Sequence, residues 1–175
     1  MEKIGQVWIE TVIYILIGLT LIALVLAFVV PKINEQKDRI IVEQTIVSLG
    51  VLDNKVNEVI GSGKDNKRIV EFGMKAGELY FDGINDKINF ILYGLSKPYS
   101  QPGIKIPVGR IVVVSTEGGK SSSVNLTLQY TGINLTFDDH DIVKKFDPSA
   151  TPYSFGIENK GINGGKDKID ISRVS

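Results

Sequence analysis

Hydrophobic residues are concentrated in one uninterrupted run near the start of the chain. From Thr11 to Val30, only Thr11, Gly18 and Thr20 are not hydrophobic, and no residue carries a charge. As a helix this run would be about 30 Å long, which matches the hydrocarbon core of a bilayer. The pattern therefore predicts a membrane-spanning helix. A buried helix of a soluble domain is excluded, because the rest of the chain is too small to surround it.

After this run the pattern becomes amphipathic. Pro31 predicts a kink, because a proline inside a helix removes one backbone hydrogen bond. Beyond it, apolar residues recur every three or four positions, which is typical of a helix with one buried face. That face consists of Val42, Ile46, Leu49, Leu52, Val56 and Val59. Gly61 and Gly63 predict the helix end, so we expect one N-terminal helix over residues 6–61.

From Lys64 onward the hydrophobic period changes to two, which indicates β-strands. The strands are expected over 69–74, 78–82, 87–93, 108–116, 122–130, 133–137, 152–159 and 168–171. Val124, Leu126, Leu128 and Tyr130 are expected on the inner face of one strand. The prolines at 98, 102 and 107 predict an irregular or edge segment. The expected fold is α+β, a long helix followed by an all-β antiparallel sandwich head over 64–175.

Charge and composition exclude several classes of function. The chain has 20 Lys plus Arg, 20 Asp plus Glu, one His and no Cys. A nucleic-acid partner is not expected, because such proteins carry a basic excess on one face. Without cysteine there is no disulfide framework and no thiol nucleophile. No catalytic triad motif occurs, so we expect neither an enzyme nor a cofactor.

The residues before the apolar run carry the most specific pattern. A short leader contains Lys3 and ends in the small residue Gly5, Gln6 follows, and Glu10 stands at the fifth position after Gly5. This resembles the class III signal of archaeal type IV pilin-like proteins. The resemblance implies that residues 1–5 are a leader peptide cut after Gly5, and that the apolar segment stays on the mature chain. Trp8 departs from one Gln-first subgroup, which leaves the particular peptidase open.

Elementary electrostatics gives Glu10 a role in this interpretation. A cut after Gly5 would create an α-ammonium group at Gln6. In a bundle of helices, a neighbouring subunit could be shifted along the bundle axis. The Glu10 carboxylate of one subunit could then pair with the Gln6 α-ammonium group of the other. Because an unpaired carboxylate is costly in a medium of low dielectric constant, the pair would fix the register of assembly.

The resemblance implies a structural subunit of a surface filament with roles in adhesion, motility or secretion. The expected partners are other copies of the chain, a prepilin peptidase, the membrane and a pilus assembly platform. The chain would lie in the cell membrane before assembly and in an extracellular filament afterwards, with its head outside. Two alternatives stay open: a monomeric membrane-anchored extracellular binding module, and a minor pilin that initiates or regulates a filament.

The orientation of the head depends on two opposing signals. Lys32, Lys37 and Arg39 follow the span while only Lys3 precedes it, and the positive-inside rule would then place the head inside the cell. We give the leader pattern more weight, because this charge bias is small. Asn125-Leu-Thr and Asn134-Leu-Thr are possible N-glycosylation sequons, and glycans at these sites would place the head outside the cell.

One acidic cluster is a candidate metal site. Asp138, Asp139, His140 and Asp141 are adjacent, and carboxylates and imidazole can bind metal ions. Their spacing does not match an EF-hand loop, so we expect an exposed acidic turn without a metal. The aromatic residues of the head are expected in its core rather than on a binding platform.

Overall fold

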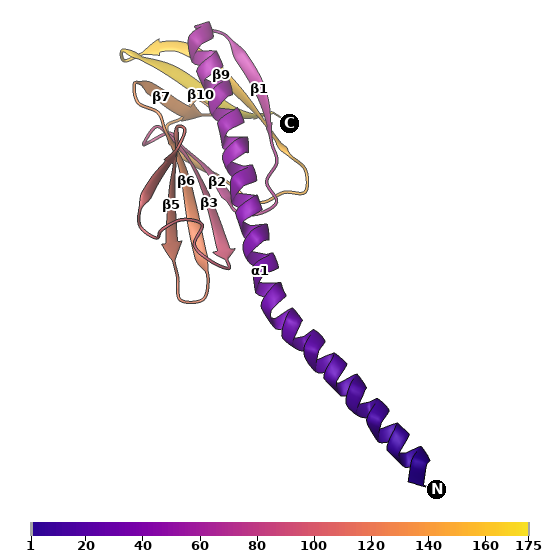
Figure 1. Cartoon of the computed structure of the whole chain (residues 1–175). Coiled ribbons are helices and arrows are strands. Elements are labelled where there is room, and N and C mark those ends of the chain that lie inside the picture. Colours follow the sequence, from indigo (N-terminus) through magenta and orange to yellow (C-terminus); the bar gives the residue numbers. More distant parts are fainter. Residues whose placement is uncertain (1, 175) are drawn as a thin grey trace. The chain divides into compact units, whose positions relative to one another are not determined.

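The computed structural model describes the backbone of residues 2–174 and the side chains from Trp8 onward (Figure 1). The chain divides into two compact units, Met1–Asp38 and Arg39–Ser175. The first unit is helical. The second contains the end of the same helix and all the strands.

Helix α1 spans Glu2–Ser62 and continues through Pro31, where the expected kink stays a prediction. The helix ends where the glycines predicted. Gly63 has a positive φ of 80°, and its amide donates to the carbonyl of Ile60 at 3.4 Å. Because glycine adopts this left-handed conformation without steric cost, the sequence Gly61-Ser-Gly63 stops the helix and turns the chain into the first strand.

The strands form two sheets (Figure 1). The four-stranded sheet has the order β1-β9-β10-β7, and the six-stranded sheet has the order β4-β5-β6-β3-β2-β8. The strand bounds are β1 Lys67–Phe72, β2 Glu78–Asp82, β3 Lys87–Leu95, β4 Lys105–Val108, β5 Ile111–Glu117, β6 Ser122–Gln129, β7 Ile133–Phe137, β8 Val143–Phe146, β9 Tyr153–Asn163 and β10 Lys166–Val174. The predicted α+β fold is confirmed, and the head is antiparallel except for the parallel pairing of β7 with β10.

The core lies between the inner faces of the two sheets. Val124, Leu126, Leu128 and Tyr130 are buried, as the alternation in β6 predicts. Phenylalanines from both sheets fill the interior. The ring centroids of Phe81 on β2 and Phe155 on β9 lie 4.9 Å apart in an edge-to-face arrangement, the geometry that aromatic pairs prefer.

The second half of α1 is part of this core. Val42, Leu49, Leu52, Val56 and Val59 are completely buried, which confirms the predicted amphipathic face, and Ile46 is partly buried against the same cluster. The Asn159 side chain on β9 donates to the Val59 carbonyl at 3.4 Å. Residues 39–62 therefore complete the hydrophobic core of the head.

The most marked differences from the predicted strands occur in two places. The segment expected as one strand over 108–116 is divided into β4 and β5, because Gly109 turns the chain with a positive φ of 61°. β4 is an edge strand and contains Pro107, as the prolines predicted. β8 was not predicted, because only Phe146 of its four residues is buried and the strand shows no alternation of apolar and polar positions.

Candidate assembly interface

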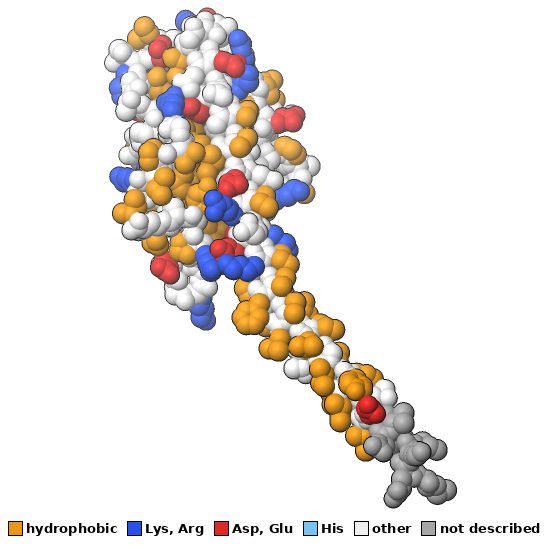
Figure 2. Space-filling view, viewed as in Figure 1, with side chains coloured by type: hydrophobic (Ala, Val, Ile, Leu, Met, Phe, Trp, Pro, Cys, Tyr) orange, Lys and Arg blue, Asp and Glu red, His pale blue; other side chains and the backbone are white. Residues whose placement is uncertain are grey.

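The apolar segment of α1 is exposed all around. From Trp8 to Val30 its large hydrophobic side chains have no cover within the chain, and they form the orange surface of this segment in Figure 2. The helix is long and apolar enough to cross a membrane. Such a surface is stable only when lipid or other apolar helices cover it.

Glu10 lies in the first turns of this apolar segment. Its carboxylate accepts a hydrogen bond from the Tyr14 hydroxyl, with 3.2 Å between Oη and Oε1. Both side chains are exposed, one helical turn apart. Lys3, Gly5 and Gln6, for which cleavage and assembly roles are predicted, lie outside the residues whose side chains the structure describes, so a pairing of Gln6 with Glu10 stays a prediction.

Charged residues reappear directly after the apolar segment. Lys32 pairs with Glu35 at 3.1 Å, and Arg39 pairs with Glu43 at 3.0 Å. These ion pairs are exposed and therefore contribute little to stability. Their position matters more, because a cluster of charges after Val30 sets the end of the membrane-compatible surface.

A second apolar surface occurs beyond these charges. Ile40, Val47 and Val51 follow one another at spacings of seven and four, so they lie on one side of the helix, opposite the buried face. All three are exposed, and Val47 is 67% exposed. We call these three residues the outer stripe. The head buries the other side of the same helical segment and leaves this stripe uncovered.

A buried polar cluster holds this helical segment to the head. The Tyr130 hydroxyl donates to Asp53 Oδ1 at 3.0 Å. Tyr130 is only 3% exposed and Asp53 only 6% exposed. Arg110 in the β4–β5 turn donates to Asn57 Oδ1 at 2.7 Å and lies 3.3 Å from Asp53 Oδ1. The Arg110 guanidinium also lies 5.2 Å from the centre of the Tyr130 ring. Two neighbouring turns of α1 are thus tied to β6 and to the β4–β5 turn.

The environment of this cluster keeps the Tyr130 hydroxyl protonated. Burial and the neighbouring Asp53 carboxylate raise the pKa of Tyr130 far above its ordinary value, because both disfavour a phenolate. Tyr130 therefore stays a hydrogen-bond donor at any physiological pH. Asp53 accepts from this hydroxyl and lies beside a guanidinium, an arrangement that a buried carboxylate needs in order to be tolerated.

A second polar network lies on the outer face of the six-stranded sheet. Glu78 accepts a hydrogen bond from Tyr80 at 2.6 Å, and the Lys145 ammonium lies 2.6 Å from its other oxygen. The hydrogen bond from Lys145, and then that from Tyr80, lower the pKa of Glu78. Lys145 also pairs with Asp147 at 2.9 Å, and the two carboxylates raise the pKa of this lysine.

The two sequons have different surroundings. Asn125 lies in the middle of β6, and Thr127 Oγ1 donates weakly to Asn125 Oδ1 at 3.4 Å. Asn134 lies on β7, but the hydroxyl of its sequon residue Thr136 is buried and donates to Asp170 at 2.7 Å. The Asn125 and Asn134 side chains are partly exposed, whereas the Thr136 hydroxyl is already used inside the head.

The acidic cluster forms a turn held by the head itself. Asp138 and Asp139 have positive φ values of 49° and 63°. The Asp139 amide donates to the buried Asp170 carboxylate at 2.7 Å, and Lys168 pairs with Asp139 at 3.1 Å. Among the residues that the structure describes, no group of three His, Asp or Glu side chains is placed to hold a metal ion. Asp138, Asp139, His140 and Asp141 form the turn between β7 and β8.

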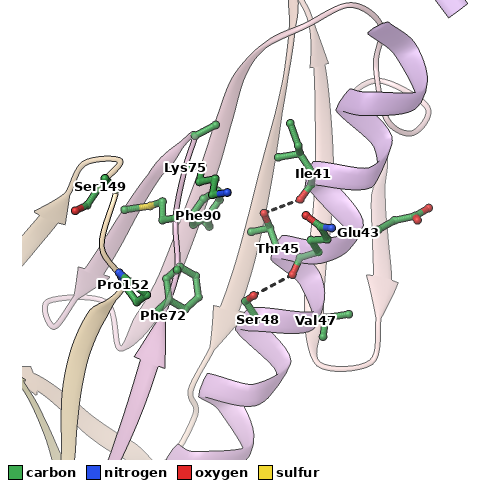
Figure 3. A pocket seen from close by; sticks show the side chains of 15 residues that line it. Ile41, Glu43, Thr45, Val47, Ser48, Phe72, Lys75, Phe90, Ser149 and Pro152 are labelled. Atoms are coloured by element: carbon green, nitrogen blue, oxygen red, sulfur yellow. Dashed lines mark hydrogen bonds between the residues drawn. The ribbon is translucent and has the colours of Figure 1, made fainter. Parts of the chain in front are cut away.

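A groove of about 720 Å³ opens between α1 and the loops of the head (Figure 3). Its walls are mainly apolar and include Ile41, Phe72, Met74, Phe90 and Pro152. The hydroxyls of Thr45 and Ser48 line it too, but they donate to the helix carbonyls of Ile41 and Gln44 at 2.8 and 3.0 Å. The groove therefore offers an apolar surface with few unused hydrogen-bonding groups, and sequence patterns gave no sign of it.

Lys75 stands at this groove and extends toward the helix in Figure 3. Within the described part of the chain it has no ion-pair partner at 4 Å or less. Glu43 and Val47 also line the groove, and their side chains point away from it in the same view.

The chain was compared with protein families, curated proteins and solved structures. No family model, curated protein or solved structure matches this chain.

Proposed function

We propose that this chain is a structural subunit of a type IV pilus-like surface filament of the archaeal kind. The apolar segment of α1 holds the subunit in the membrane and then bundles with the same segment of other copies. The β-sandwich head forms the outside of the filament. Cleavage after Gly5 leaves Gln6 as the new N-terminus. The α-ammonium group of Gln6 then pairs with the Glu10 carboxylate of a neighbouring copy.

The outer stripe is the observation that carries this proposal. A monomeric anchor requires apolar surface only where the helix contacts lipid, and the 20 positions from Thr11 to Val30 are enough for that. Ile40, Val47 and Val51 come after a cluster of charges and are still uncovered. An exposed apolar stripe at helical spacing is typical of a surface that packs against another helix. The stripe therefore supports assembly over the monomeric binding module.

The head supports a structural role in a second way. The second half of α1 is part of the head's own core, and the Asp53–Tyr130–Arg110 cluster fixes it there. In a filament held together by helices, every head must be joined firmly to its own helix. Helix α1 is continuous over Glu2–Ser62, so no flexible loop of the kind that suits an independent binding module separates its apolar segment from the part that is buried in the head.

The test uses the full chain, tagged at its C-terminus, in the cells that produce it. We expect immunogold labelling of surface filaments by electron microscopy, and mass spectrometry of the filament protein should place its first residue at Gln6. External protease should remove the tag from intact cells. A chain that keeps Met1 to Gly5 and stays dispersed in the membrane would contradict the proposal and favour the anchored binding module.

A further inference from the structure

We infer that the groove beside α1 receives an apolar projection from the head of a second copy, in a head-to-tail contact. This rests on the proposed function and adds a specific contact between heads. The projection consists of Ile84, Ile142 and Val143, which we call the apolar knob. Groove and knob belong to the same head and lie at opposite ends of the same pair of strands.

The apolar knob is formed where two loops meet. Ile84 is in the β2–β3 turn, Ile142 directly precedes β8, and Val143 is the first residue of β8. The Gly83 amide donates to the Ile142 carbonyl at 3.0 Å, and Val143 pairs with Asp82, so both loops are fixed at one end of the six-stranded sheet. All three side chains are exposed, Ile84 by 66%. An exposed group of branched apolar side chains marks an interaction surface more often than a lone one does.

Strands β2 and β8 connect the knob to the groove. β2 begins after the groove residues Met74, Lys75 and Ala76 and ends at Asp82 beside the knob. β8 runs the opposite way, from the knob residue Val143 to Phe146, and the chain then reaches the groove residues Ser149 and Ala150. At about 3.4 Å per residue, the five residues of β2 separate the two surfaces by roughly 17 Å.

One pair of charges on the two surfaces is complementary. Lys75 lies at the groove, and Asp141 directly precedes Ile142 of the knob. Both side chains are exposed, and neither has an ion-pair partner within 4 Å among the residues the structure describes. When the knob of one copy enters the groove of the next, an unpaired carboxylate approaches an unpaired ammonium group. Such complementarity favours this partner orientation over its reverse.

The position of the two surfaces determines the kind of assembly. The knob and the groove are different surfaces, so a contact between them is heterologous and leaves one free knob and one free groove at the ends of every open oligomer. Because the surfaces lie at opposite ends of β2, the contact extends in one direction. It generates an open row of heads, in keeping with a filament, whereas two identical surfaces would close a dimer.

Disulfide trapping tests the contact, because the native chain has no cysteine. We would introduce Ile84→Cys and Ala150→Cys together in the full chain and oxidise the cells mildly. A bond within one chain is excluded, since a disulfide requires Cα atoms within about 7 Å. We expect a ladder of covalent oligomers, no ladder from either single variant, and a crosslinked dimer when the two single variants are produced together. Val143→Cys with Ser149→Cys provides a second pair in case the first disturbs assembly.

In the matched control the first cysteine is placed at Ile162 instead of Ile84. Ile162 is 78% exposed in the β9–β10 hairpin and belongs to neither surface. Ile162→Cys with Ala150→Cys should give no ladder. Lys75→Glu should reduce the ladder of the first pair, and adding Asp141→Lys should restore it. Filaments that assemble while both cysteine pairs crosslink no more than this control overturn the contact and leave the proposed function intact. Native chains that form no filaments overturn the proposed function itself.

Discussion

The Tyr130 hydroxyl donates to Asp53 Oδ1 at 3.0 Å and so joins the end of β6 to the middle of the helical segment that completes the core. The bond connects residues 77 positions apart in the sequence. Because both side chains are buried, it contributes to fixing the helix on the head, beyond the apolar packing around it.

Replacing Tyr130 with Phe should therefore destabilise the head. The change removes a hydrogen bond from the buried Asp53 carboxylate, which keeps only Arg110 beside it, and a hydrogen bond to a charged group contributes about 1.5–3 kcal/mol. Urea unfolding of the full chain in detergent, followed by tyrosine fluorescence and circular dichroism, should show a loss of this size. Tyr80→Phe is the matched control, because Glu78 keeps its contact with Lys145 near solvent. This variant should lose no more than about 0.5 kcal/mol of unfolding free energy. Equal losses in the two variants would contradict a special role for the buried pair.

The Glu78–Lys145 contact predicts a pH dependence in the acid range. The pKa of Glu78 is lowered in the folded head, chiefly by the hydrogen bond from Lys145. Its stabilisation is therefore fully present above the unfolded pKa, which is about 4.3 for Glu. It is lost as the pH falls through the lower folded pKa. Lys145→Met should raise the pKa of Glu78 toward its ordinary value, as measured by carboxyl NMR titration. An unchanged pKa in this variant would show that Lys145 does not hold it down.

The two sequons should differ in use. Thr136 is buried and donates to Asp170, so the second sequon has no free hydroxyl in the folded head, whereas Thr127 makes only a weak contact within its own sequon. We expect glycopeptide mass spectrometry of the chain purified from the cells that produce it to find a glycan at Asn125 and none at Asn134. Asn125→Gln should remove the added mass, and Asn134→Gln should leave it unchanged. A glycan at Asn134 would mean that modification precedes folding of β7.

The sequence predicted those parts of the fold whose signal is periodic and local. The bounds of β2 and β7 agree with the prediction, and so does the buried face of α1, because each has an alternation or a three-to-four spacing of apolar residues. β8 could not be predicted, since Lys144 and Lys145 interrupt any apolar pattern in an edge strand. The contact of Asp53 with Tyr130 and the groove depend on tertiary packing, which local patterns do not encode.

Unlike the groove and the Asp53–Tyr130 contact, the outer stripe has a local signal in the sequence. Ile40, Val47 and Val51 have helical spacing, but the stronger buried stripe on the same helix obscured them. Only burial separates the two stripes, since it shows that the head covers one of them and leaves the other exposed.

The two faces of α1 should respond oppositely to substitution, and this provides the sharpest test of the outer stripe. Leu49 is fully buried against the head, so Leu49→Ala should cost about 2–5 kcal/mol of unfolding free energy. Val47 lies on the exposed side, so Val47→Lys should change the stability of the detergent-solubilised chain by no more than about 0.5 kcal/mol. In cells, however, Val47→Lys should abolish filaments, because a neighbouring helix would have to bury an unpaired ammonium group. Ile162→Lys is the matched control, with an equally exposed aliphatic side chain away from the helix, and should assemble normally. Normal filaments from Val47→Lys would show that no helix packs on the stripe and would return the chain to the class of monomeric membrane-anchored modules.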